Sequence, residues 1–154
     1  MRNLWEEAKK ISVQTGADIT GGFNIGFQKG IPDETKDELM AFVYWVEDCY
    51  QLPITLWVDF QYKHYLIRDG KRVGYRFYWV DYPSLEVFDN FDDIPVIELP
   101  VRLENQSLEA VLRSFAAAIS HYYAWLLGLD MHSFDPEEAL TEAILRDYYI
   151  FRGE

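Results

Sequence analysis

The hydrophobic pattern along the chain is most regular between residues 105 and 128. Apolar side chains recur there at spacings of three and four, which places them on one face of an α-helix. These apolar positions are Leu108, Val111, Leu112, Phe115, Ile119, Tyr122 and Leu126. Gly128 follows the last of them, and glycine readily adopts the left-handed conformation that ends many helices. The pattern therefore predicts a central helix over 107–128.

Three further stretches show a shorter helical pattern, and they cover residues 3–14, 33–51 and 136–150. The second of these ends before Pro53, because a residue that precedes proline avoids the helical conformation. Pro136 suits the first turn of the last helix, where a missing N–H costs nothing. Helices are thus predicted near both ends of the chain and on both sides of the predicted strands.

Alternating apolar and polar residues, which are typical of strands, occur at 54–61, 72–82 and 96–103. Asp69-Gly70 precedes the second of these stretches and is a strong signal for a hairpin turn. Pro100 lies in the third stretch and cannot donate a hydrogen bond to a neighbouring strand, so this strand is predicted to lie at a sheet edge, at least near Pro100.

The glycine-rich segment 16–30 has no clear periodicity, and we interpret it as a hairpin or an irregular loop. Its repeated Gly-Phe pairs would lay Phe23 and Phe27 onto the core. Together the elements predict an α+β fold in a single domain, residues 1–154. In this fold a small, mostly antiparallel sheet packs on the central helix 107–128 and its flanking helices.

The composition and charge of the chain limit the kinds of molecule that it is expected to bind. Hydrophobic residues make up 49% of the 154 residues, which is ample for a packed core. The formal net charge of −12 disfavours nucleic acid and anionic membranes, because phosphate surfaces attract cations, but it permits a basic protein partner. No apolar run is long enough to span a membrane, and the first ten residues lack the apolar core of a signal peptide. The single Cys49 cannot form an internal disulfide, so we expect a cytoplasmic protein.

The segment Ala117–Trp125, AAISHYYAW, resembles the His-Glu-x-x-His motif of small, single-domain gluzincin-type metalloproteases. In that family two histidines one helical turn apart bind zinc, and the glutamate accepts a proton from the zinc-bound water. Ala117 and Ala118 stand where the family has its first histidine and its glutamate, and His121 stands at the second histidine. The order of the elements ahead of the helix is also similar, so the resemblance implies a minimal zincin-like fold.

The family's third zinc ligand is a glutamate on the following helix, and Glu137 or Glu138 stands at the similar position. A methyl group neither binds metal nor accepts a proton. The resemblance therefore implies a pseudoenzyme with no catalytic residue, no metal site and no cofactor, whose remnant positions are Ala117, Ala118, His121, Glu137 and Glu138. We expect a catalytically inactive binding or regulatory module for an unidentified protein or peptide. Changing Ala117→His and Ala118→Glu together should restore zinc binding, at a stability cost that rises with the burial of these positions.

Other interpretations of the function and of His121 remain open. The chain is alternatively an acidic, non-enzymatic interaction protein of the immunity or inhibitor type, or an enzyme of unrelated chemistry housed in the same cleft. His121 is a structural histidine, a pocket-lining polar group or a metal ligand. The aromatic residues on or near the sheet form a platform for a ligand unless a second layer covers that face. They are Trp57, Tyr62, Tyr65, Tyr75, Tyr78, Trp79 and Tyr82.

Overall fold

The computed structural model describes residues 22–50, 52, 54–81, 93–103, 107–126 and 140–153. Its helices and strands are β1 (Phe23–Phe27), α2 (Asp33–Cys49), β2 (Leu56–Gln61), β3 (Leu66–Arg68), β4 (Lys71–Val73), β5 (Arg76–Asp81), β6 (Asp93–Pro100), α3 (Leu108–Leu126) and α4 (Leu140–Arg152). The predicted helix over 3–14 lies outside the described residues, as do positions 127–128 and 136–139 of the two later predicted helices. Among the described helices, none combines the length and the apolar character needed to cross a membrane.

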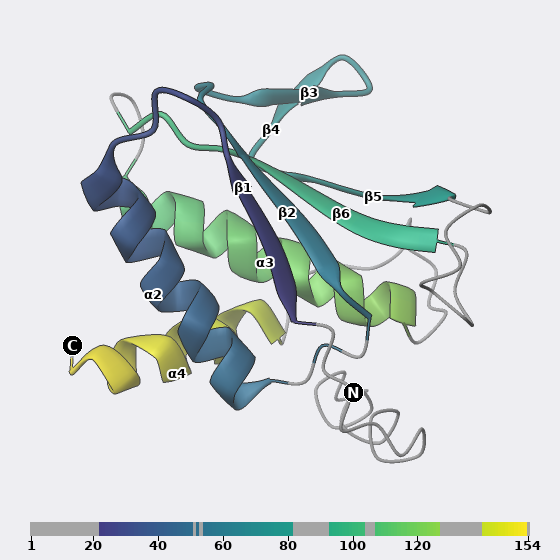
Figure 1. The fold of residues 1–154 in the computed structure, drawn as a ribbon. Helices are drawn as coiled ribbons and strands as arrows, with labels where there is room; N and C mark the ends of the chain where they lie inside the picture. The colour runs from purple at the N-terminus through teal and green to yellow at the C-terminus, as the bar shows by residue number, and fades with distance from the viewer. Residues whose placement is uncertain are drawn as a thin grey trace.

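Four strands form the main sheet in the order β1-β2-β6-β5, and the helices lie on one side of it (Figure 1). The predicted α+β class is confirmed. The prediction that the sheet is mostly antiparallel is wrong in detail, because β1 pairs with β2 and β2 with β6 in parallel, and only β5 and β6 are antiparallel. Helix α2 connects β1 to β2, and a crossover of this kind is what makes two strands parallel.

Residues Phe23–Phe27 form an edge strand, so the prediction of a hairpin or irregular loop for this segment is wrong. Within the strand, inward residues alternate with exposed ones. The alternation is hard to recognise in the sequence because Gly26 occupies one of the outward positions. As predicted, the two phenylalanines pack on the core: Phe23 lies edge-on to Phe115 at 5.7 Å between ring centroids, and Phe27 stacks on Phe60 at 4.9 Å.

Strand β6 lies between β2 and β5, so it is not an edge strand over its whole length, and the edge predicted from Pro100 exists only near that residue. The next residue, Val101, donates its N–H to the carbonyl of Gln61 in β2 at 2.7 Å. Neighbouring residues of a strand direct their backbone groups to opposite sides. The nitrogen of Pro100 is therefore on the β5 side, where the ladder has already ended with the pair Arg76 and Glu98. A proline costs no ladder hydrogen bond at this position.

Strands β3 and β4 form a separate antiparallel hairpin, which confirms the turn predicted at Asp69-Gly70. Both turn residues have a positive φ, 52° at Asp69 and 77° at Gly70, as such turns require. An added Cβ on Gly70 would meet no atom within 4 Å. The hairpin therefore ends in a tip that carries no packing contacts.

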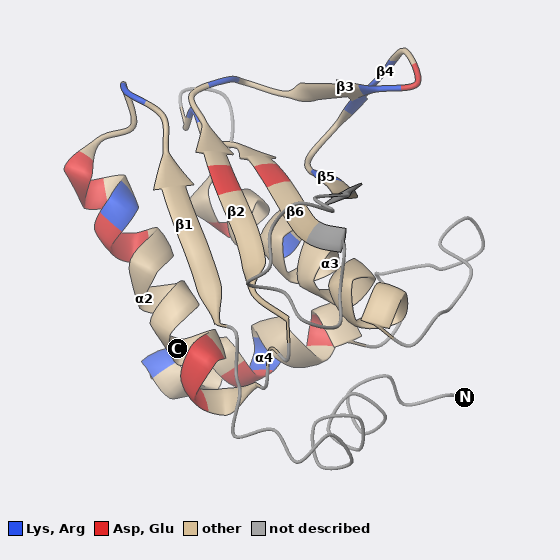
Figure 2. Ribbon diagram, turned by 45° about the vertical axis from the view of Figure 1, so that its right-hand side comes forward, with Lys and Arg blue, Asp and Glu red and all other residues tan. Residues whose placement is uncertain are grey.

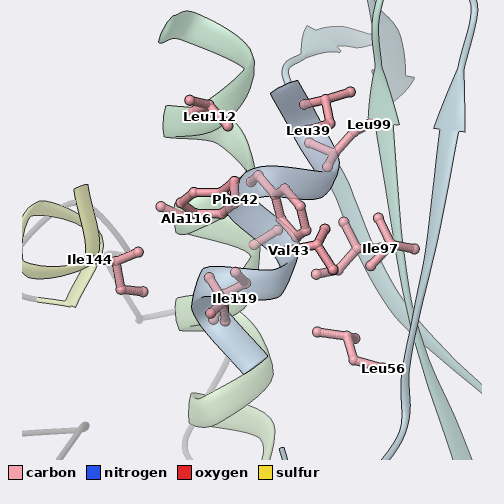
Figure 3. Packing of buried hydrophobic residues seen from close by; sticks show 14 of the residues in the cluster. Leu39, Phe42, Val43, Leu56, Ile97, Leu99, Leu112, Ala116, Ile119 and Ile144 are labelled. Atoms are coloured by element: carbon pink, nitrogen blue, oxygen red, sulfur yellow. The ribbon is translucent and has the colours of Figure 1, made fainter. Parts of the chain in front are cut away.

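The core lies between the sheet and the three helices (Figure 3). Helix α3 supplies the predicted apolar stripe, and Phe115, Ile119 and Tyr122 on it are fully buried. Figure 3 shows Phe42 and Val43 of α2 between α3 and the strands. The alternation predicted for 54–61 is confirmed by the buried, inward residues of β2. Packing against the sheet and the other helices therefore fixes the orientation of α3 relative to β5 and β6.

Candidate functional site

One lane of α3 runs along β5, and it contains the histidine of the remnant motif. At its start, a Cβ added to Gly74 would come within 2.6 Å of the Ser114 hydroxyl, so glycine is required for this close approach. About two turns further along, Nδ1 of His121 lies 2.7 Å from the Tyr75 hydroxyl. Near the end of the helix, Trp125 stacks with Trp79 at 6.2 Å between ring centroids. The lane therefore faces the outermost strand of the described sheet.

The five remnant positions do not form a zinc site in the described part of the chain. Ala117 is 6% exposed and His121 8% exposed, and their helical spacing puts both on the lane that faces β5. Ala118 is fully buried and belongs to the core cluster instead. Glu137 and Glu138 lie outside the described residues. Two methyl groups and one imidazole do not supply the three ligands that zinc requires, and among the described residues no group of three potential ligands exists.

His121 is held as a neutral imidazole. Burial, and next the positive charge of Arg68, lower its pKa to about 4. The hydrogen bond between His121 and Tyr75 is therefore neutral at pH 7, and the imidazole tautomer decides which of the two side chains is the donor. A neutral histidine that is buried and hydrogen-bonded in this way has the surroundings of a structural residue.

The opposite face of the sheet carries no helix in the described part of the chain (Figure 1). We call this surface the open face. Strand register places its side chains in two rows across β1, β2, β6 and β5. One row consists of Asn24, Trp57, Val96 and Tyr78, and the other of Gly26, Asp59, Glu98 and Arg76. Acidic residues accordingly lie side by side on β2 and β6 in Figure 2.

A polar cluster joins the second row. The Nε2 group of Gln61 donates to Asp59 at 2.9 Å and to Glu98 at 2.8 Å, so one amide bridges the two carboxylates. Arg76 pairs with Glu98 at 2.6 Å, and the Tyr78 hydroxyl donates to the same carboxylate. Burial, and next the charge of Glu98, raise the pKa of Tyr78, which keeps its proton available for this bond.

Two buried atoms of this cluster have no hydrogen-bond partner among the described residues: Oε1 of Gln61 and Nε of Arg76. Gln61 itself is only 5% exposed, which is unusual for a glutamine. Since Nε2 serves two carboxylates, the opposite assignment of the amide would place its oxygen against negative charge. The cluster is therefore ordered but incompletely satisfied, and such groups in a native structure call for an explanation.

The aromatic residues of the predicted platform lie in several different places in the structure. Only Trp57 and Tyr78 lie on the open face in the described part of the chain, where they are 40% and 38% exposed. Trp79 and Tyr75 are on the helix side of β5, where they contact α3. Tyr82 lies outside the described residues. The last two are away from the open-face rows: Tyr62 packs under Arg102 at 4.9 Å, and Tyr65 under Arg72 at 4.2 Å.

A surface cavity of about 430 Å³ lies elsewhere, between the three helices. Its lining includes Leu108 and Leu112 of the first turns of α3 and Tyr148 of α4. Two charged residues of the lining are already paired, since Nη2 of Arg152 lies 3.5 Å from Glu38. The cavity is on the far side of α3 from the open face and shares no residue with the remnant motif.

Sequence reasoning missed the polar cluster for a physical reason. Asp59 and Glu98 each follow the alternation of their own strand, so in the sequence they resemble ordinary outward residues. Only the parallel register between β2 and β6 makes them neighbours, and that register links residues far apart in the chain. The buried Gln61 at the end of β2 is a local signal, because an amide in an apolar strand needs polar partners.

No family model matches the chain, and neither the curated proteins nor the solved structures compared with it give a match. The resemblance to the metalloprotease motif therefore rests on the residues of α3 themselves.

Proposed function

We propose that the chain is a catalytically inactive, zincin-like protein that serves as a binding module for a protein or peptide. One observation carries the binding role: Trp57 and Tyr78 are exposed on the open face, directly beside a row of ordered polar side chains. Tryptophan and tyrosine contribute disproportionately to protein interfaces, since each combines a large apolar area with a polar group. The face thus combines apolar contact area with fixed hydrogen-bonding groups.

The inactive state is supported by the surroundings of the motif positions. Hydrolysis at a zinc site needs an ion with an open position and a base beside the bound water. The base position is Ala118, whose methyl group points into the core. His121, the surviving ligand position, is engaged with Tyr75. These residues support the packing of α3 on β5, which in turn positions the strands of the open face. The proposal places this module in the cytoplasm, where an exposed lone thiol such as Cys49 stays reduced.

Zinc analysis of the purified protein tests the inactive state. We expect far less than one zinc ion per chain after extensive dialysis, and no cleavage of a mixed peptide substrate when zinc is added. Stoichiometric, tightly held zinc with peptidase activity would defeat this part of the proposal.

A peptide-display selection tests the binding role. We expect enriched peptides whose binding is lost in the double variant Trp57→Ala with Tyr78→Ala. The matched control is Tyr44→Ala with Ile150→Ala, which removes two side chains that are 61% and 67% exposed on helices. Peptides that bind both variants equally, or a selection that enriches nothing, would contradict the proposal.

A further inference from the structure

Within the open face, the two carboxylates of the polar cluster differ in how far they are satisfied. Glu98 accepts from Gln61, Arg76 and Tyr78, so its oxygens are occupied. Asp59 accepts one hydrogen bond in the described part of the chain, the one from Gln61. A carboxylate offers about four acceptor positions. Asp59 therefore retains acceptor capacity on the side away from Glu98, and no cation among the described residues pairs with it.

The strand next to Asp59 on that side provides space for a ligand. Gly26 is opposite Asp59 in the register between β1 and β2, and it has no side chain. A Cβ added there would meet only the Val58 carbonyl, at 4.0 Å, and the residue is exposed. The surface above Gly26 is therefore open, and Asp59 is its neighbour on β2; we call this open space the notch. Trp57 lies on the same face two residues earlier in β2, roughly 7 Å along the strand.

The charge of this region selects the kind of group that fits the notch. Asp59 and Glu98 contribute two negative charges to the cluster, and Arg76 contributes one positive charge, which is already committed to Glu98. One negative charge is uncompensated here, in a chain whose net charge is −12. A positively charged group with several N–H donors complements this charge and the free acceptor positions of Asp59.

We infer that the notch over Gly26 binds an arginine side chain from a basic segment of a partner protein, with Asp59 as its ion-pair partner and Trp57 as an apolar wall. The inference rests on the proposed function and specifies its partner. Arginine suits the site better than lysine because its planar guanidinium carries five donors and stacks on an indole ring. The amide of Gln61 holds the two carboxylates together, so the site is formed before the ligand arrives.

The peptide-display selection described above also tests this inference. We expect the enriched peptides to share one basic position, with arginine more frequent than lysine. If peptides that depend on Trp57 and Tyr78 are enriched but share no basic position, the arginine site is wrong and the binding module stands. If nothing is enriched, or the binding ignores both aromatic residues, the binding module itself fails.

A double-mutant cycle on one enriched, fluorescein-labelled peptide then locates the contact. We expect Asp59→Asn in the protein and arginine→alanine in the peptide each to weaken binding about tenfold. Because both changes remove the same ion pair, the two together should weaken binding little more than either alone. Fully additive losses would overturn the assignment. The matched control is Asp37→Asn, the same charge change at an exposed position of α2, and it should leave the affinity unchanged.

A second variant keeps the inference testable if Asp59→Asn disturbs the polar cluster. Gly26→Val adds a side chain to the notch, in a strand position with no positive φ and no close neighbour. Its thermal unfolding should match or exceed that of the wild type, because valine favours strands. We expect it to weaken binding of the same labelled peptide at least fivefold by excluding the guanidinium. Wild-type affinity in a folded Gly26→Val protein would show that the notch is not the site.

Discussion

Replacing Ala118 with glutamate restores the base of the metalloprotease motif, and it tests the orientation of α3 most directly. Ala118 has no exposed surface and belongs to the core between the sheet and the helices. In an active protease the corresponding glutamate faces a water-filled cleft. The two surroundings predict very different consequences for the same substitution.

The cost has two parts that can be worked out separately. A glutamate buried without a partner takes up a proton, and at pH 7 this costs about 3.7 kcal/mol relative to an unfolded pKa of about 4.3. Forcing the extra atoms into a packed core adds about 1–3 kcal/mol. The sum of about 5–7 kcal/mol approaches the whole stability of many domains, which is about 5–15 kcal/mol. We therefore expect Ala118→Glu to be largely unfolded or severely destabilised.

Urea denaturation followed by tryptophan fluorescence measures this cost. Ala118→Gln has nearly the same shape without the charge, so the difference between the two variants isolates the ionisation part. The folded state binds the proton that the unfolded state releases, so this difference grows as pH rises: about 1 kcal/mol at pH 5 and about 3.7 kcal/mol at pH 7. Ala110→Glu, at an exposed position in the first turn of the same helix, is the matched control and should change stability by less than about 0.5 kcal/mol.

If Ala118→Glu were as stable as Ala110→Glu at pH 7, position 118 would reach solvent and the reasoning would be refuted. The result also bears on restoration of the complete motif. With Ala118 buried, the change of Ala117→His together with Ala118→Glu carries the high stability cost. We expect this variant to lose its fold in preference to gaining a zinc site.

Three further predictions concern single contacts. In the folded chain His121 takes up a proton only near pH 4, against about 6.5 when unfolded, so the free energy of unfolding falls as pH drops from 6.5 towards 4. Urea unfolding of the wild type at pH 6.5 and 4.5 should show this loss, about 1–2 kcal/mol after solvent screening, and His121→Gln should lack it. Tyr122→Phe should cost about 2–4 kcal/mol in urea unfolding, because the buried hydroxyl bonds both the N–H and the carbonyl of Ile54; a cost below 1 kcal/mol would mean that water replaces it. Arg113→Ala removes an exposed ion pair with Glu142 and should change the unfolding midpoint very little; a loss above about 1 kcal/mol would contradict this.

Much of the fold could be predicted because its signals are local. The stripe of α3, the alternation of β2 and the Asp69-Gly70 turn each depend on residues within one element, and the structure contains all three. The orientation of α3 was only half predictable. Periodicity separates its apolar stripe from the lane of His121, but it does not show that Ala118 falls on the buried side of that boundary.

The features that the sequence did not predict depend on contacts between segments that are distant in the chain. The strand Phe23–Phe27 is short and contains a glycine at an outward position, so its pairing with β2 supplies order that its own sequence does not indicate. Pro100 does mark an open side of β6, because the pairing with β5 ends before it, but the sequence of β6 does not show that β5 covers the rest of the strand. The polar cluster needs the same register, since Asp59, Gln61 and Glu98 come from two strands that meet only in the sheet.

The hairpin of β3 and β4 offers a practical route to observing the binding module at work. Its tip is open at Gly70, so an inserted dye or a linker to a sensor surface would leave the core untouched. Yet strand β3 of the hairpin is tied to the open face, because Arg76 donates a hydrogen bond to the carbonyl of Ile67 at 3.1 Å. A label at the tip would therefore be mechanically connected to the residue that neutralises Glu98, and occupation of the open face would be reported at a distance from the ligand.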